Sequence, residues 1–234
     1  MARRLFFLPE IHDGLAELRG EEARHLSKVL RVEPGQVYEI SDNQQRYLAA
    51  VDAVHKEHVS FRVIEPLPTV PDACHLTLAM ALVKFDRLEW VLEKATELGV
   101  HRIVPFWCDR SENGLEKAAG KRMERWRKIL IESAQQSRRT FLPLVAEPVA
   151  LETVLAIEAQ ARYFLDEVPA DAVFAPAKSA SAAMVVGPEG GWTERERQAA
   201  LRAGWQAVGL GPRILRAETA ALAALAILGN ANLR

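Results

Sequence analysis

The sequence predicts a two-domain α/β protein, in which a small β-barrel domain precedes a layered domain with a mostly parallel sheet. In residues 1–70 the apolar residues form short, partly alternating segments separated by turn residues, as in small barrels. The stretch 65–72 has three prolines within six positions, which neither a helix nor a central strand tolerates. In residues 71–234 apolar strand patterns alternate with helical ones, as in α/β layer folds. We therefore place the domain boundary at residue 70.

The first domain is expected to contain short strands and one helix. Three segments are predicted strands: 36–40, 47–51 and 58–64. The helix is predicted at 21–30, with Leu26, Val29 and Leu30 on one side.

The second domain is expected to alternate strands with helices. Five apolar segments are predicted strands: 75–83, 102–107, 162–166, 182–187 and 206–210. Four segments are predicted helices: 86–98, 116–137, 193–203 and 217–228. A capping-box pattern starts two of these helices, formed by Asp86 with Glu89 and by Thr193 with Glu196. The helix at 217–228 is apolar on nearly every face and must be buried, so we expect a homodimer, with burial inside one subunit as the alternative.

Cysteine and histidine usage predicts neither a disulfide scaffold nor a metal site. The sequence has two cysteines, Cys74 and Cys108, which are too few for a disulfide scaffold. Neither lies near a histidine at zinc-ligand spacing. His55 and His58 are expected to point to opposite faces of one strand. We therefore expect two reduced thiols and no bound metal.

The apolar segments are too short for a signal peptide or a membrane span. The run near the N-terminus stops at Pro9, and the longest apolar stretch, 217–228, is well below the roughly 20 residues that cross a bilayer. We therefore expect a cytoplasmic protein with no membrane partner.

A basic segment at 121–140 is a candidate for RNA contact, although the net charge of −1 does not favour nucleic-acid binding by itself. The segment has seven basic residues against two acidic ones. Such a local positive potential attracts a polyanion even on a neutral protein. A solvated helix face is an equal alternative. Closer to the linker, the charges at 84–89 and 94–100 favour an amphipathic helix with salt bridges.

Two loops that follow predicted strands have residues suited to ligand binding. The first, 187–191, reads Gly-Pro-Glu-Gly-Gly, and its glycines let the backbone approach a ligand closely. The alternative is a tight turn without a ligand. The second loop, before the helix at 217–228, places Arg213, Arg216 and Glu218 between apolar segments, where charges are costly unless paired or used. An Arg–Glu pair at the helix start is the alternative there. Such strand ends are where open α/β sheets bind ligands.

The motifs, taken together, resemble one family, the RsmE family of bacterial small-subunit ribosomal RNA uridine-N3 methyltransferases in the SPOUT superfamily. The resemblance spans nearly the whole chain and is strongest in five segments: 25–31, 94–99, 136–139, 187–191 and 210–220. Asp109 stands where the family would lead us to expect glutamate. The carboxylate is retained, so only its reach differs.

The resemblance implies a PUA-like β-barrel RNA-binding domain at 1–70 and a SPOUT α/β methyltransferase domain at 71–234. The methyltransferase domain would contain a trefoil knot that forms a pocket for S-adenosyl-L-methionine, and the enzyme would act as a homodimer. The substrate would be 16S ribosomal RNA of the small subunit. The base must be unpaired before transfer, because uridine N3 lies on the pairing edge.

The resemblance also implies roles for individual residues. Arg216 and Glu218 are the catalytic candidates: Arg216 would stabilise the anion at N3 or O4, and Glu218 would orient Arg216 or accept the proton. Eleven residues would bind the cofactor: Leu165, Gly187, Pro188, Glu189, Gly190, Gly191, Leu210, Gly211, Ile214, Leu215 and Thr219. Six arginines are candidates for RNA binding: Arg3, Arg4, Arg24, Arg31, Arg138 and Arg139.

Three other functions are compatible with parts of this sequence. A ribose 2′-O-methyltransferase of the same superfamily would share the cofactor pocket. A non-catalytic RNA-binding ribosome assembly factor would have the same fold but a pocket that no longer supports catalysis. A phosphate-binding nucleotide enzyme is disfavoured, because the glycine loop lacks the Walker lysine.

Overall fold

The chain divides into two compact units, and we describe each by itself. The structure, a computed structural model, describes residues 4–69, 72–167 and 174–233. The small unit comprises Met1–Pro71 and Ala134–Leu142, and the large unit comprises Asp72–Ser133 and Pro143–Arg234. The sequence did not predict that 134–142 groups with the small unit.

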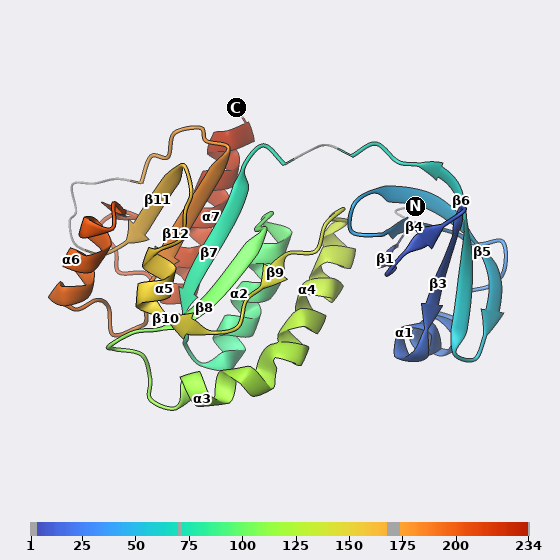
Figure 1. The fold of residues 1–234 in the computed structure, drawn as a ribbon, viewed down its shortest axis with the longest axis horizontal. Helices are drawn as coiled ribbons and strands as arrows, with labels where there is room; N and C mark the ends of the chain where they lie inside the picture. The colour runs from blue at the N-terminus through green and yellow to red at the C-terminus, as the bar shows by residue number, and fades with distance from the viewer. Residues whose placement is uncertain (1–3, 70–71, 168–173, 234) are drawn as a thin grey trace. The chain divides into compact units, whose positions relative to one another are not determined.

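The small unit is built on a six-stranded sheet in the order β1-β4-β5-β6-β3-β2 (Figure 1). Its strands are β1 (Leu5–Phe7), β2 (Ile11–His12), β3 (Leu15–Arg19), β4 (Val37–Ser41), β5 (Arg46–His55) and β6 (His58–Pro66). The three predicted strands correspond to β4, β5 and β6. The alternating residues Ile40, Val51 and Phe61 point into a core that is closed to solvent.

Two predictions for the small unit are wrong. The helix expected at 21–30 is a short α1 (Gly20–Arg24) followed by a π-helix, η1 (His25–Leu30). Leu26 is buried and Leu30 packs partly buried against the same core, but the wider π turn leaves Val29 65% exposed, so only part of the expected apolar side forms.

His55 and His58 do not point to opposite faces of one strand. They face each other across the β5–β6 hairpin, with ring centroids 5.9 Å apart. A tight turn between the two residues, which the strand pattern did not reveal, places them on neighbouring strands. Within the described ranges no group of three metal-ligating side chains is present.

The large unit contains a parallel sheet in the order β10-β8-β7-β12-β11-β13, with β9 beside β8 (Figure 1). Its strands are β7 (His75–Ala81), β8 (Arg102–Trp107), β9 (Leu144–Val145), β10 (Val149–Ala150), β11 (Ala161–Leu165), β12 (Ser181–Val186) and β13 (Gln206–Val208). The five predicted strands are present with small shifts at their ends. All described pairings in this sheet are parallel, so the carboxyl ends of its strands meet at one edge.

Helices cover both faces of this sheet. They are α2 (Phe85–Glu97), α3 (Leu115–Ala119), α4 (Met123–Ser137), α5 (Leu151–Leu155), α6 (Glu194–Arg202) and α7 (Ala217–Leu233). Leu78 and Met80 of β7 pack in a core with α2, α4 and α7, whereas Ala79 and Ala81 pack in a second core with α5 and α6. The alternation along β7 thus builds a three-layer α/β domain.

The helix ends differ from the predictions in two places. The helix expected at 116–137 is broken by a 3-10 turn, η2 (Gly120–Arg122), between α3 and α4. The N-cap of α2 is Lys84 rather than Asp86, and no side chain caps it, so the capping box predicted there is wrong. The capping box of Thr193 with Glu196 at α6 is confirmed.

Helix α7 is buried largely inside the large unit. Ala221, Ala224, Leu225 and Leu228 are closed to solvent in the core that faces α2. Ile227 remains 39% exposed. Across the part of the chain that the structure describes, no helix is both long and apolar enough to span a membrane.

Candidate active site

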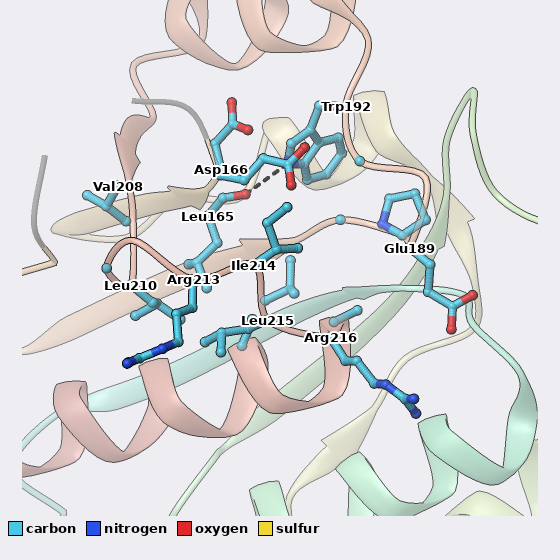
Figure 2. A pocket seen from close by; sticks show the side chains of 18 of the residues that line it. Leu165, Asp166, Glu189, Trp192, Val208, Leu210, Arg213, Ile214, Leu215 and Arg216 are labelled. Carbon is cyan, nitrogen blue, oxygen red and sulfur yellow. Dashed lines mark hydrogen bonds between the residues drawn. The ribbon is translucent and has the colours of Figure 1, made fainter. Parts of the chain in front are cut away.

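Three loops at the carboxyl edge of the parallel sheet enclose a cavity of about 360 Å³. They follow β11, β12 and β13, and the last of them leads into α7. Figure 2 shows Leu165, Val208, Leu210 and Leu215 forming its apolar wall. This volume lies within the roughly 300–1,000 Å³ of small-molecule sites, and the position is the expected one for open α/β sheets.

The glycine loop after β12 is shaped by one buried indole. The Trp192 side chain is 2% exposed, and its Nε1 donates a hydrogen bond to the carbonyl oxygen of Leu165, 2.8 Å away (Figure 2). It also packs on the rings of Phe164 and Phe106. A Cβ added at Gly187 would lie 2.7 Å from the indole, so only glycine fits at this position. The indole therefore fixes the backbone at the start of the loop.

The segment after β8 braces the same glycine loop from outside. Arg110 donates from Nη1 to the carbonyl oxygen of Gly190 over 2.9 Å, and its Cβ would lie 3.2 Å from a Cβ at that glycine. Asp109 accepts hydrogen bonds from Thr193 and from Arg195 at the start of α6. The side chain of Asp109, although shorter than a glutamate, thus reaches the capped N-terminus of α6.

Carboxylates line the cavity near the end of β11. Asp166 and Glu167 both belong to its wall. The Asp166 side chain is 2% exposed and accepts a hydrogen bond of 2.7 Å from Nε of Arg197. This hydrogen bond raises the pKa of the Arg197 guanidinium, which stays charged and compensates the buried carboxylate.

Arg216 and Glu218 differ sharply in exposure. The Arg216 side chain is 72% exposed, whereas that of Glu218 is 10% exposed, and Nη1 of the arginine lies 4.0 Å from Oε1 of the glutamate. In Figure 2 the side chains of Arg216 and Glu189 extend toward one side of the cavity and that of Arg213 toward the other. Arg216 is thus an exposed cation at the rim of the cavity.

Most residues predicted to bind a cofactor come together in this cavity. Nine of them line it: Leu165, Gly187, Pro188, Glu189, Gly191, Leu210, Gly211, Ile214 and Leu215. Arg216 also lines it, whereas Gly190, Thr219 and Glu218 lie beside it. The sequence analysis missed Asp166, Glu167 and Trp192, although Trp192 directly follows the glycine loop.

The arginines predicted to bind RNA all belong to the small unit, and Arg3 lies outside the described residues. Arg4 and Arg31 are exposed. Arg24 pairs with Glu57 at 2.6 Å, and Arg138 lies 3.6 Å from Glu39. The last of the six, Arg139, is half-buried. Two of these cations are therefore partly neutralised by neighbouring carboxylates.

We expect Cys108, at the end of β8, to be a poor nucleophile at neutral pH. Burial raises the pKa of its thiol to about 11, and the carboxylate of Glu196 adds to the rise. At pH 8 roughly one molecule in a thousand would carry the reactive thiolate. Its alkylation by iodoacetamide, followed by mass spectrometry, is expected to accelerate up to pH 10. A rate that levels off between pH 9 and 10, as that of a thiol with the ordinary pKa of about 8.5 does, would contradict this.

Comparisons with known proteins assign the chain to a class and then to a family. The family described as RNA methyltransferase domain matches residues 70–229, so the chain is an RNA methyltransferase by family. The ribosomal RNA small subunit methyltransferase E of Bacillus subtilis is 35% identical and covers 90% of this chain and 88% of its own length. The corresponding protein of Aquifex aeolicus is 33% identical, and the match covers 97% of this chain and 99% of the relative. The chain belongs to the ribosomal RNA small subunit methyltransferase E family, which confirms the resemblance to RsmE.

Two solved structures agree with this assignment. The ribosomal RNA small subunit methyltransferase E of Neisseria gonorrhoeae, bound to S-adenosyl methionine, is 32% identical with a TM-score of 0.87, and 96% of each chain is covered. A putative methyltransferase of Legionella pneumophila, in complex with the same cofactor, is 29% identical with a TM-score of 0.89, covering 99% of this chain and 98% of that one. Both structures support the α/β methyltransferase fold.

Proposed function

We propose that this protein methylates N3 of a specific uridine in 16S ribosomal RNA of the small subunit, with S-adenosyl-L-methionine as the methyl donor. One observation carries the proposal. The cavity at the carboxyl edge of the sheet joins a glycine loop to an exposed arginine, Arg216, at its rim. The family supplies the class of reaction, and the cavity supplies a place for it.

The cavity suits S-adenosylmethionine in its chemistry. Leucine and valine side chains line one part and match the adenine ring, while the acidic Glu167 matches the cationic parts of the molecule. The carboxylates of Asp166 and Glu189 are already paired with arginines. Gly187 leaves no room for a side chain, because its backbone lies against the Trp192 indole. The cofactor supplies a methyl group already activated on a sulfonium.

The protein's own residues then have to position the base and manage its proton. Uridine N3 bears a proton, and negative charge develops on N3 and O4 as that proton leaves. Arg216 would stabilise this charge from the rim of the cavity. Glu218 would either orient Arg216 or accept the proton. No covalent nucleophile is needed, since positioning supplies much of the rate.

We further propose roles for the parts of the chain. The small unit would be a PUA-like barrel that binds RNA through exposed arginines such as Arg4 and Arg31, within the expected domain 1–70. The large unit would be the SPOUT domain at 71–234, with its cofactor loops in a trefoil knot. The homodimer remains part of this proposal as the sequence analysis expects it, with the partly exposed Ile227 on α7 as a candidate contact.

Isothermal titration with S-adenosylmethionine tests the cofactor site. We expect saturable binding by the wild type and none by Gly190→Trp, because the added side chain would collide with Arg110 and distort the loop. Gly120→Ala is a matched control, since a Cβ there meets nothing within 4 Å. No binding by the wild type at millimolar ligand, with or without RNA, would contradict the enzyme and favour a non-catalytic RNA-binding factor.

A nucleoside digest of the methylated RNA tests the position of the methyl group. N3 methylation shifts the mass of the uracil base, whereas ribose 2′-O-methylation shifts that of the sugar. We expect the label on the base of one uridine in 16S RNA. A label on the sugar would replace the proposal by the ribose-methylating alternative.

A further inference from the structure

Four charged side chains form a cluster at the side of the cavity where Arg216 extends: Arg87, Glu189, Arg216 and Glu218. Arg87 belongs to α2, and it forms an ion pair with Glu189 of the glycine loop. Its Nε also lies 4.0 Å from Oε1 of Glu218. Nη1 of Arg216 lies 4.0 Å from that same oxygen. Two arginines therefore share one carboxylate oxygen.

The exposures of these side chains show which arginine is the inner partner. Glu218 is 10% exposed, Arg87 is 29% exposed and Arg216 is 72% exposed. Oε2 of Glu218 is closed to solvent and accepts no hydrogen bond from any residue that the structure describes. A buried carboxylate needs a compensating cation and unfilled acceptor sites invite a donor. Glu218 is thus able to bind a further guanidinium.

We infer that Arg87 is a positioning residue that neutralises Glu218 and thereby keeps the contact of Arg216 with that carboxylate loose, so that Arg216 can reach the target nucleotide. The inference rests on the proposed function, since that function assigns Arg216 to the substrate. Without Arg87, two glutamates of the cluster would face Arg216 alone. Coulomb attraction would draw the Arg216 guanidinium onto Glu218, where both carboxylate oxygens can accept its hydrogen bonds.

This role separates Arg87 from Lys94 of the same helix. Lys94, also on α2, pairs with Glu93 and Glu97 of the same helix, as the sequence pattern predicts. The two ion pairs of Arg87 instead reach the glycine loop and the start of α7. Arg87 is not one of the described residues that line the cavity. Its effect on the reaction would therefore pass through the two carboxylates that it contacts, and of these Glu218 is the one that also lies next to Arg216.

Chemical modification of Arg216 in the protein without cofactor or RNA is the direct test. Phenylglyoxal reacts with accessible guanidinium groups, and the rate at Arg216 can be followed by mass spectrometry of its peptide. We expect Arg87→Gln to slow this rate about fivefold, because an ion-paired arginine is shielded. The double variant Arg87→Gln with Glu218→Gln is expected to return it to the wild-type rate. Lys94→Gln is the matched control, with a similar exposure of 34% and no expected effect.

Turnover and cofactor binding provide the second readout. We expect kcat of Arg87→Gln to fall about tenfold, because the stabilising cation is withdrawn from the substrate. The dissociation constant of S-adenosylmethionine is expected to stay within about twofold, because Arg87 itself does not line the cavity. Arg87→Lys is expected to restore most of kcat, because an ammonium group still compensates Glu218. This variant also keeps the test open if Arg87→Gln fails to fold.

The possible outcomes separate this inference from the proposed function. An unchanged modification rate in Arg87→Gln would overturn the inference, as would a loss of cofactor affinity that accounts for the whole loss of turnover. Slower modification, reversed in the double variant, supports the electrostatic role of Arg87. If the wild type then transferred no methyl group to RNA, that result would contradict the proposed function alone.

Discussion

Gly187→Ala is expected to abolish measurable binding of S-adenosylmethionine. The new Cβ would lie 2.7 Å from Cε2 and 2.9 Å from Cζ2 of Trp192, and the indole cannot yield easily. It is 2% exposed, hydrogen-bonded to the carbonyl oxygen of Leu165 and packed on Phe164. The strain would move the glycine loop and cost about 1–3 kcal/mol of stability. Isothermal titration and thermal unfolding of the same sample measure both effects.

A double variant identifies the cause of that loss. Trp192→Phe removes the part of the ring that the new Cβ would touch, so Gly187→Ala is expected to cost less stability in the Trp192→Phe background. Gly120→Ala again provides the control for adding a methyl group where there is space. Equal costs of Gly187→Ala in both backgrounds would show that the indole does not fix the loop.

Arg216→Ala is expected to lower kcat by about 10²–10³-fold, as the loss of a group that stabilises developing negative charge typically does. The dissociation constant of the cofactor is expected to change little, because the guanidinium is 72% exposed at the rim. Single-turnover transfer of labelled methyl to 16S RNA, together with cofactor titration, separates the two quantities.

Arg202→Ala is the control for the loss of a positive charge. Arg202 is an exposed residue in the last turn of α6 and does not line the cavity. We expect it to retain wild-type turnover. Full turnover of Arg216→Ala, with normal binding of cofactor and RNA, would exclude the role of this arginine in stabilising the anion.

Local signals in the sequence predicted most of the parallel domain and the loops of the cavity. The strand patterns of β7 and β8 are continuous and apolar because both faces of the sheet are covered. The capping box of Thr193 and Glu196 places the start of α6 directly after the glycine loop. Such signals come from residues that are close together in the sequence, so they can be recognised without the structure.

The parts that were missed leave no signal in the local sequence pattern. Arg87 and Glu218 are far apart in the sequence, and the charge pattern around Arg87 indicated only a helix with internal salt bridges. The sequence analysis also did not foresee that a Cβ at Gly187 would meet the indole of Trp192. The π turn at His25–Leu30 has no distinct sequence period, so Val29 was placed on the wrong side.

The grouping of 134–142 with the small unit has a consequence for how the chain is made and divided. Ser41 donates a hydrogen bond to the carbonyl oxygen of Thr140, and the amide of Leu142 donates one to Asn43, each across 99 positions in the sequence. During synthesis the first 71 residues therefore emerge well before the last segment of their own unit. N-terminal domains usually fold first on the ribosome, but this unit has its full set of contacts only once residue 142 is available. A gene cut at the proline linker would separate the small unit from part of itself, so no single cut yields both units whole.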